Sequence, residues 1–393
     1  MNQSLSYVIV TPYTVAKSRT GGILSRLLSS VDLELVGAQV IAADKHFASS
    51  YAAILREQSD PKNPDAAELL ARYVENNIGP SGGRPHRSLF LLFRGENAYR
   101  KLSDICGALY PENRSVESIT GETIRDTYSD LIYDEHNPKQ VNYFEPAVFT
   151  PRDRQLADKV LTLLSQWLPS QPNIIENILY PDPSVVERTL VIIKPENWRY
   201  ASSKPGTIID MFSKTGLRIV GMKVHRMSVN EALEFYGQVD EALKKKLSPI
   251  MGEKALEVLQ QEMGMKFSKT SLEALSSSFG VQWAHDQFEQ IVEFMSGRSI
   301  STTPLDQRDA AGIAKSLIIV YEGVNACQKI REVLGPTDPS KAPEGTIRRE
   351  FGTDVMINTA HASDSPQSAE REMRVTQVQH NRCAEIIATY LAQ

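Results

Sequence analysis

Tyr7-Val-Ile-Val-Thr-Pro12 returns in the second half of the chain as Leu190-Val-Ile-Ile-Lys-Pro195. Each stretch is a short apolar run that ends at a proline, which is typical of a buried β-strand. Similar sequences also follow the two stretches, because Gly22–Leu28 and Gly206–Phe212 both begin amphipathic helical patterns. This likeness predicts that a strand and a helix recur in the same order in both halves.

More matching blocks follow further along the chain. They are Val36-Gly37 with Val220-Gly221, Ser88–Ala98 with Ser316–Ala326, and Thr123-Ile-Arg125 with Thr346-Ile-Arg348. Two matching apolar strings could arise by chance, but this many blocks in one order indicate a tandem duplication.

Each copy has the pattern of strand, helix, strand, helices, strand, helix, a Thr-Ile-Arg loop and a last strand. This order predicts an α+β fold of two ferredoxin-like (split βαβ) sandwich domains, each an antiparallel sheet covered by helices. We predict a first domain at residues 1–170, a linker rich in proline at 171–185 and a second domain at 186–393. The second copy also has an insertion at about 241–284 with apolar residues at helical spacing. A surface helical elaboration is the favoured reading of this insertion, and a substrate lid is the alternative.

The composition limits the classes of function. Of the 393 residues 23% are charged and 41% hydrophobic, with a net charge of −5, as in soluble globular proteins. No basic surplus exists for sequence-independent nucleic-acid binding, and no apolar stretch is long enough to span a bilayer. The three widely spaced cysteines suggest neither a disulfide framework nor a zinc site, and the N-terminus lacks a signal-peptide pattern. These features predict a cytoplasmic protein.

The segment Asn358–Ser365, Asn-Thr-Ala-His-Ala-Ser-Asp-Ser, is where we expect chemistry. His361 is an imidazole flanked by amide, hydroxyl and carboxylate side chains, and Pro366 suits the first turn of a helix that follows. A helix N-terminus presents N–H groups and a positive dipole end, which favour an anion such as phosphate. The same pattern is also that of an ordinary surface histidine before a helix, so the context of His361 has to decide between the two.

That context comes from a family resemblance. Residues 188–373 resemble the nucleoside diphosphate kinase family in an ordered set of motifs: Val191-Ile-Ile-Lys194-Pro195, Ile219-Val-Gly-Met-Lys223, Tyr236, Tyr321-Glu-Gly-Val-Asn325, Leu334-Gly-Pro-Thr337-Asp-Pro339, Gly345-Thr-Ile-Arg348, Asn358 and His361-Ala-Ser-Asp-Ser365. The resemblance implies a kinase in which His361 takes the γ-phosphate of ATP or another nucleoside triphosphate. The phosphohistidine then passes the phosphoryl group to a nucleoside diphosphate.

The resemblance also implies roles for other residues. Glu372 would orient His361, and Ser363 and Tyr236 would support the histidine. Nucleotide-binding residues would be Lys194, Tyr236, Arg331, Thr337, Arg348 and Asn358, with Asn358 at the sugar hydroxyls and the cations and Thr337 at the phosphates.

Further implications concern cofactors and partners. Mg²⁺ would be held by the nucleotide phosphates, with Asp364 reaching it through water. Partners would be ATP and nucleoside diphosphates, without a membrane or a specific nucleic acid. We expect the two domains to pair within the chain and allow for a homo-oligomer.

The chain departs from the family pattern at several positions. Glu196-Asn197 replace an Asp-Gly pair, and Ala362 replaces a glycine. Asp286-Gln287-Phe288, after the insertion, stands in place of the family's Pro-Phe-Phe segment, which carries the aromatic residue that stacks on the base. In the first copy, alignment of the two sequences places Thr11 at Lys194, Ser103 at Arg331 and Glu145 at His361, and leaves Arg125 and Asn142 as the shared residues. We therefore predict a first half without kinase activity, in which a residual ligand site stays open.

The alternative to an enzyme is a non-catalytic nucleotide-binding or regulatory protein. The presence of the whole set of His361, Lys194, Arg331 and Arg348 favours the enzyme.

Overall fold

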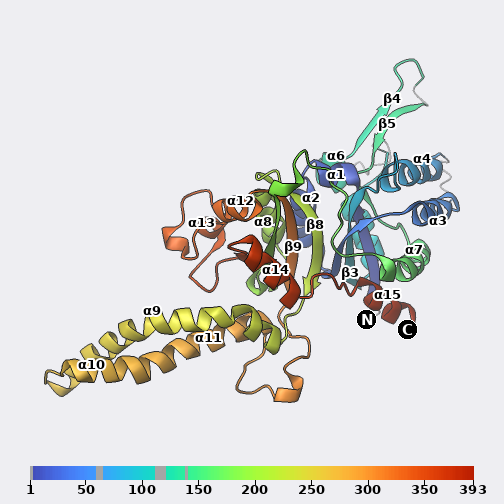
Figure 1. The fold of residues 1–393 in the computed structure, drawn as a ribbon. Helices are drawn as coiled ribbons and strands as arrows, with labels where there is room; N and C mark the ends of the chain where they lie inside the picture. Colours follow the sequence, from blue (N-terminus) through green and yellow to red (C-terminus); the bar gives the residue numbers. More distant parts are fainter. Residues whose placement is uncertain (1–2, 59–64, 111–120, 138–139) are drawn as a thin grey trace. The chain divides into compact units, whose positions relative to one another are not determined.

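The computed structural model describes residues 3–58, 65–110, 121–137 and 140–393. The chain forms two compact units (Figure 1). Unit 1 consists of Met1–Val224, Leu317–Met373 and Gln377–Gln393, and unit 2 consists of His225–Ser316 and Arg374–Thr376. The predicted first copy and most of the second therefore lie in unit 1, whereas unit 2 holds the predicted insertion and the parts of the second copy on either side of it. The boundary predicted near residues 170–186 falls inside unit 1 and stays a prediction.

The first half of unit 1 is built on a four-stranded sheet in the order β2-β3-β1-β6. The strands are β1 (Gln3–Val10), β2 (Glu34–Ala42), β3 (Arg87–Glu96) and β6 (Val148–Phe149), and all their pairings are antiparallel. The helices are α1 (Pro12–Ala16), α2 (Thr20–Ser30), α3 (Lys45–Arg56), α4 (Ala66–Tyr73), α5 (Ala98–Cys106), α6 (Ile124–Tyr128) and α7 (Arg154–Trp167).

The second half repeats this plan with a sheet in the order β10-β7-β9-β8. The strands are β7 (Val186–Ile193), β8 (Arg218–His225), β9 (Ser316–Val324) and β10 (Ala360–Ala362). The helices in unit 1 are α8 (Lys204–Ser213), α12 (Ala326–Leu334), α13 (Ile347–Phe351), α14 (Pro366–Val375, whose last residues belong to unit 2) and α15 (Cys383–Leu391). In both sheets the first and third strands of the copy lie in the centre and the fourth lies beside the first. This is the ferredoxin-like order, so the predicted fold class is confirmed.

Local sequence explains where several of these elements begin. Thr11 accepts a hydrogen bond from the Thr14 N–H and is followed by Pro12 at the first position of α1. Proline also opens α14, at Pro366, as predicted. Proline suits this position because its missing N–H would have no partner in the first turn of a helix.

One element of the first half has no counterpart in the second. β4 (Asp130–Tyr133) and β5 (Val141–Glu145) form a separate two-stranded antiparallel sheet directly before β6. This hairpin changes the spacing between the Thr-Ile-Arg segment and the fourth strand, which matters for the comparison of the two copies below.

Segments cross between the two halves of unit 1. Ile174, from the predicted linker, forms a β-bridge with Gly221 of β8 in the second half. In return α15 packs against the first half, where Cys383 and Ile387 belong to the same buried cluster as Phe47 and Leu164.

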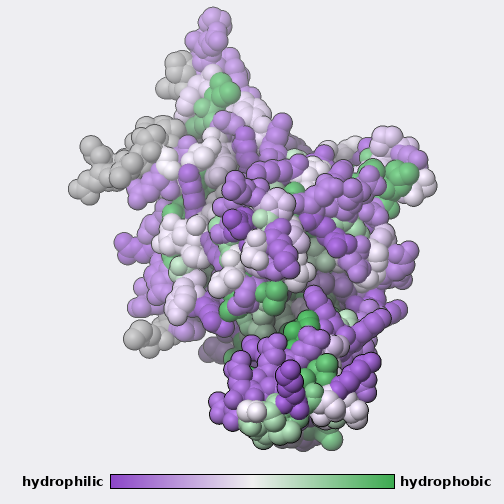
Figure 2. All heavy atoms as spheres, turned by 90° about the vertical axis from the view of Figure 1, so that its left-hand side faces the viewer, coloured by the Kyte–Doolittle hydropathy of each residue, from purple (hydrophilic) through white to green (hydrophobic). Residues whose placement is uncertain are grey.

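Unit 2 is largely helical, and its role as a surface elaboration or a lid stays a prediction. It contains α9 (Val229–Met263), α10 (Lys269–Leu275), a π-helical turn (Ser276–Gly280) and α11 (Val281–Ser296). Ser228 begins α9 with a capping box, because its side chain accepts from the Glu231 N–H while the Glu231 carboxylate accepts from the Ser228 N–H. Hydrophobic side chains exposed on this unit include Ile250, Val258, Met263, Met265 and Phe279. Figure 2 shows one face of the molecule, on which hydrophobic side chains lie among hydrophilic ones.

Among the described residues, no helix combines the length and the apolar character that crossing a bilayer requires.

Candidate active site

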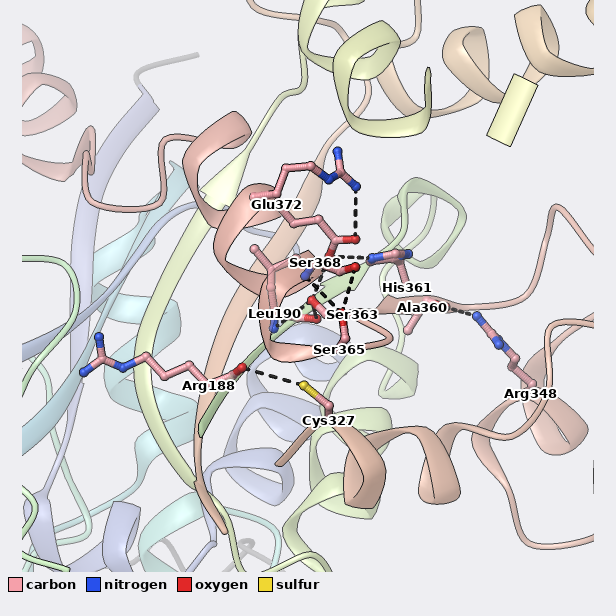
Figure 3. Close-up of polar contacts among 11 residues, drawn as sticks. Arg188, Leu190, Cys327, Arg348, Ala360, His361, Ser363, Ser365, Ser368 and Glu372 are labelled. Atoms are coloured by element: carbon pink, nitrogen blue, oxygen red, sulfur yellow. Dashed lines mark hydrogen bonds and ion pairs between the residues drawn. The ribbon is translucent and has the colours of Figure 1, made fainter. Parts of the chain in front are cut away.

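His361 lies on β10, where it pairs with Ile192 of β7. Its Nε2 is 2.9 Å from Oε2 of Glu372, which projects from α14 (Figure 3). Ser363 donates a hydrogen bond of 2.7 Å from its hydroxyl to the same oxygen, Glu372 Oε2. Glu372 is 4% exposed, so its carboxylate is buried and is held by the buried Ser363 and the partly exposed His361. The structure therefore brings together the histidine, the carboxylate and the serine that the sequence predicted.

The start of α14 fixes this arrangement. Ser365 accepts a hydrogen bond of 3.1 Å from the Ser368 N–H, as an N-cap side chain does. The Ser365 hydroxyl in turn lies 3.1 Å from the Ser368 hydroxyl. Because β10 and α14 are joined by only a few residues, this cap sets how Glu372 faces His361.

Lys194 follows directly after β7 and points to the loop before β10. Its Nζ donates to Oδ1 of Asn358 at 2.7 Å and to the Met356 carbonyl at 3.0 Å. The Asn358 amide nitrogen donates to the carbonyls of Thr337 at 3.1 Å and Val355 at 2.7 Å. Both polar atoms of the Asn358 side chain thus have partners within the protein.

Burial lowers the pKa of Lys194 to about 8, because the low-dielectric surroundings disfavour its charged form. The nearby charge of Arg348 lowers this pKa as well, whereas the carboxylates of Glu196 and Asp354 raise it. An incoming phosphate would act in the same direction as the carboxylates. This lysine is therefore poised to gain its full charge when an anion binds.

The two predicted arginines differ in their surroundings. Arg331 on α12 is exposed, and one of its terminal nitrogens lies 3.4 Å from the Asp364 carbonyl. Arg348 on α13 is half-buried and donates to the carbonyls of Gly335 at 3.0 Å and Ala360 at 2.9 Å. Arg348 therefore ties the end of α12 to β10, next to His361.

Glu196 and Asn197, which the sequence showed only as departures from the family pattern, hold the loop before His361. Thr359 has a left-handed backbone, with φ of 74°. Its N–H donates to Oε1 of Glu196 at 2.8 Å, and its carbonyl accepts from the Asn197 side chain at 2.8 Å. Asn197 also donates to the Lys194 carbonyl at 3.1 Å. Glu196 and Asn197 thus join the segment after β7 to the segment before β10. The sequence offered one sign of this role, which is that both residues stand close to Lys194. Their contacts with Thr359 join residues that are 162 or more positions apart in the chain.

The geometry corrects the alignment of the first copy. The Thr11 N–H donates to the Ala147 carbonyl at 3.0 Å, just as the Lys194 N–H donates to the Thr359 carbonyl at 3.0 Å. Ala147 and Thr359 both have positive φ, 61° and 74°. Two residues further on, Phe149 pairs with Ile9 and His361 pairs with Ile192.

Phe149 therefore occupies the place of His361, and the prediction that Glu145 does so is wrong. The prediction that Asn142 matches Asn358 is wrong as well, because Pro146 stands at that place. Asn142 and Glu145 lie on β5, in the hairpin that the first copy carries before its fourth strand. The equivalences of Thr11 with Lys194 and of Arg125 with Arg348 hold, since Arg125 also bridges two carbonyls, those of Gly107 and Val148.

Glu145 has a different use. Its buried carboxylate accepts hydrogen bonds from Thr11 at 2.7 Å, from the Ala147 N–H at 3.0 Å and from the Tyr73 hydroxyl. It serves the first copy as Glu196 serves the second, by holding the N–H of the residue with positive φ.

Tyr236 and Phe288 belong to unit 2. Tyr236 lies on α9, 8% exposed, with its ring 4.8 Å from that of Phe235. Phe288 lies on α11, 3% exposed, with its ring 6.1 Å from that of His285. Their predicted roles toward His361 and the base stay predictions.

Comparison with known proteins assigns the family. Residues 187–251 and 250–380 match the family model for nucleoside diphosphate kinase. A nucleoside diphosphate kinase of Pyrobaculum aerophilum is 31% identical over 199 residues, which cover 48% of this chain and 93% of that relative. One of Nitratiruptor sp. is 30% identical over 188 residues, with coverage of 48% and 93%. The chain belongs to the nucleoside diphosphate kinase family.

The predicted family and enzyme class are thereby confirmed. The crystal structure of an NDP kinase from Pyrobaculum aerophilum is 29% identical and covers 48% of this chain and 94% of that one, with a TM-score of 0.33. The matched segments of the family model contain the residues of the candidate site described above, from Lys194 to Glu372.

Proposed function

We propose that this chain is a nucleoside diphosphate kinase that transfers the γ-phosphate of ATP to a nucleoside diphosphate through a phosphohistidine on His361. The contact between His361 and the buried Glu372 carries the proposal. Because Nε2 of the imidazole is hydrogen-bonded to Glu372, the other ring nitrogen, Nδ1, is the one that attacks phosphorus. The bond from phosphorus to the bridging oxygen breaks, ADP leaves, and Glu372 balances the positive charge that develops on the imidazole.

The second half-reaction reverses the first. A terminal phosphate oxygen of the nucleoside diphosphate attacks phosphorus, and the phosphorus–nitrogen bond breaks, which restores His361. Positive charge near the moving phosphoryl group is supplied by Lys194 and Arg331, because phosphoryl transfer depends mainly on positioning and charge. Thr337 and Asn358 complete the nucleotide site.

Asp364 fits the proposed contact with Mg²⁺. Its carboxylate is exposed, and hydrogen bonding from Ser368 lowers its pKa, so it stays ionised and offers the hard oxygen that Mg²⁺ prefers. When bound, the ion would offset part of the charge of the nucleotide phosphates, and Asp364 would reach it through water.

We also propose that the two copies pair as subunits of a dimer do. A Cβ added to Gly21 of α2 would lie 2.3 Å from the Asp210 backbone nitrogen, and one added to Gly206 of α8 would lie 2.2 Å from the Ser25 backbone nitrogen. Each helix thus places a glycine against the other, which is the reciprocal pattern of a two-fold interface. Ser25 donates to the Ser203 carbonyl at 3.2 Å across the same contact. Light scattering of the full chain would show whether whole chains associate further.

The proposed compartment is the cytoplasm. The three cysteines, at positions 106, 327 and 383, are buried and form no disulfide, which is the usual state in a reducing compartment.

The deciding experiment is brief incubation with γ-labelled ATP and Mg²⁺, followed by addition of a nucleoside diphosphate. We expect label on His361 in an acid-labile, alkali-stable linkage, and its transfer to the added diphosphate. The variant His361→Ala should take up no label, whereas Phe149→His should leave labelling at one site, because Thr11 and Ser103 supply no cations in the first copy. Full labelling of His361→Ala would disprove the mechanism, and labelling without transfer would favour a regulatory protein.

A further inference from the structure

The first copy contains a cavity of about 410 Å³ at the place that corresponds to the kinase site. Phe149, the positional equivalent of His361, lines it, together with Ser103 and Arg125, the equivalents of Arg331 and Arg348. A volume of this size falls within the range of small-molecule sites, roughly 300–1,000 Å³. The cavity is therefore in the position of an active site and large enough for a ligand, but its lining has changed.

The changes remove the capacity to bind polyphosphate. Among the described residues that line the cavity, the charged side chains are two acids and two arginines, and there is no lysine: Asp104, Arg125, Asp126 and Arg152. The terminal nitrogens of Arg125 already donate to the carbonyls of Gly107 at 2.5 Å and Val148 at 2.9 Å. No net positive charge is left to offset several phosphate charges.

One part of the wall is apolar and aromatic. Tyr51, Leu55, Phe149 and Leu156 line the cavity and are each 5% exposed or less. The ring of Phe149 lies 6.0 Å from that of Tyr51 in an edge-on arrangement and 5.7 Å from that of Tyr73. An added aromatic ring can extend such a cluster with favourable edge or offset contacts, and the apolar wall gains from its removal from water.

We infer that the first copy binds an uncharged small molecule that carries an aromatic ring, at the place where the second copy holds its nucleotide. The vacated position has become a pocket that combines an apolar, aromatic wall with charged groups that balance one another. This inference does not depend on the kinase activity of the second copy, so the two can fail separately.

The test uses the neutral, apolar fluorescent dye N-phenyl-1-naphthylamine with the full chain. We expect a saturable rise in fluorescence with one dye per chain, and an excess of ATP with Mg²⁺ should not displace the dye. The variants Ser103→Trp and Ala67→Trp fill the cavity from α5 and α4, and each should abolish the saturable signal. Ser103→Ala is the matched control and should bind like the unchanged chain. Circular dichroism and kinase activity report whether each variant is folded.

Two results would overturn the inference. Dye binding that survives both tryptophan variants would place the dye elsewhere, such as on the exposed Met263 and Met265 of unit 2. Displacement of the dye by ATP with Mg²⁺ would place it in the kinase site. If one tryptophan variant fails to fold, the other variant and the displacement by ATP still decide.

Discussion

At the scale of single residues, Lys194 meets two opposing demands. Burial beside β7 lowers its pKa to about 8, yet a phosphate contact requires its charged form. Glu196 eases this conflict, because its carboxylate raises the pKa of Lys194 while its Oε1 holds the Thr359 N–H at 2.8 Å. The Glu-Asn pair after Pro195 thus combines an electrostatic role with a positional one.

A pH dependence follows from the lowered pKa of Lys194. Below about pH 8 the free enzyme has a charged Lys194, and above it the amine is neutral and loses its attraction for phosphate. We therefore expect kcat/KM for ATP to fall as pH rises through about 8, since this parameter reports the ionisation of the free enzyme. Steady-state kinetics between pH 6 and pH 10 would measure this fall, which is the alkaline limb of the pH–rate profile.

The variant Glu196→Gln is the control, because glutamine keeps an oxygen for the Thr359 N–H and removes only the charge. The alkaline limb should move to lower pH in Glu196→Gln. In Lys194→Arg it should disappear, because arginine stays charged. A limb at the same pH in Glu196→Gln as in the unchanged chain would contradict the assignment to Lys194.

At the scale of secondary-structure elements, one arginine in each copy ties a helix end to the fourth strand. Arg348 bridges the carbonyls of Gly335, after α12, and Ala360, in β10. Arg125 bridges those of Gly107, after α5, and Val148, in β6. The first copy has Thr11 and Ser103 in place of Lys194 and Arg331, yet it keeps this bridge. The shared role of the two arginines is therefore structural.

This comparison predicts different outcomes for three alanine variants. Arg331→Ala removes an exposed cation. It should lower kcat/KM by an amount that corresponds to roughly 2–4 kcal/mol of lost transition-state stabilisation, and the melting temperature should not change. Arg348→Ala leaves two carbonyls without a donor and should lower both activity and the free energy of unfolding, the latter by about 1–3 kcal/mol. Denaturant unfolding and kinase assays would measure both quantities.

Arg125→Ala is the matched control in the first copy. It should lower the free energy of unfolding by a similar amount and leave the kinase activity of the folded chain unchanged. Equal stability of Arg125→Ala and the unchanged chain would show that the carbonyl bridge does not matter.

At the scale of the whole molecule, the two halves of unit 1 depend on each other through exchanged segments. Asn381, after α14, donates to the carbonyls of Ala38 in the first half at 2.8 Å and Met222 in the second at 3.2 Å. It also donates to Oδ1 of Asn173 at 2.8 Å. The C-terminal helix α15 then buries Ile387 in the core of the first half. The kinase half therefore has an apolar helix whose partner surface belongs to the other copy.

We expect the isolated fragment 185–393 to aggregate or to unfold at a lower temperature than the full chain, because α15 and α8 lose their partners. In the full chain, Ile387→Ala should lower the free energy of unfolding by about 2–4 kcal/mol, as other truncations of buried isoleucine do. Leu391→Ala on the same helix is the control and should have little effect, since Leu391 is 37% exposed. Thermal unfolding, light scattering and kinase assays would measure these effects. A fragment that is monodisperse, equally stable and equally active would contradict the proposed pairing.

The sequence by itself determined the features that arise from local pattern. Apolar runs ended by proline marked β1 and β7, and the repeated blocks predicted two sheets of one order. Pro366 and the Ser and Asp side chains before it marked the start of α14. The ordered motifs predicted that His361, Ser363 and Glu372 come together. These residues are close in the sequence, because only a few residues join the strand of His361 to the helix of Glu372.

Only the tertiary structure decided which residues are equivalent across the copies. Equivalence is set by pairing across a sheet, where Phe149 faces Ile9 as His361 faces Ile192, and not by distance along the chain. The β4–β5 hairpin shifts that distance, so counting along the sequence selected Glu145. The contacts of Glu196 and Asn197 with Thr359, and the crossing of α15 to the first half, likewise join residues far apart in the sequence. Hydrogen bonding and burial hold them there, and no local pattern carries that information.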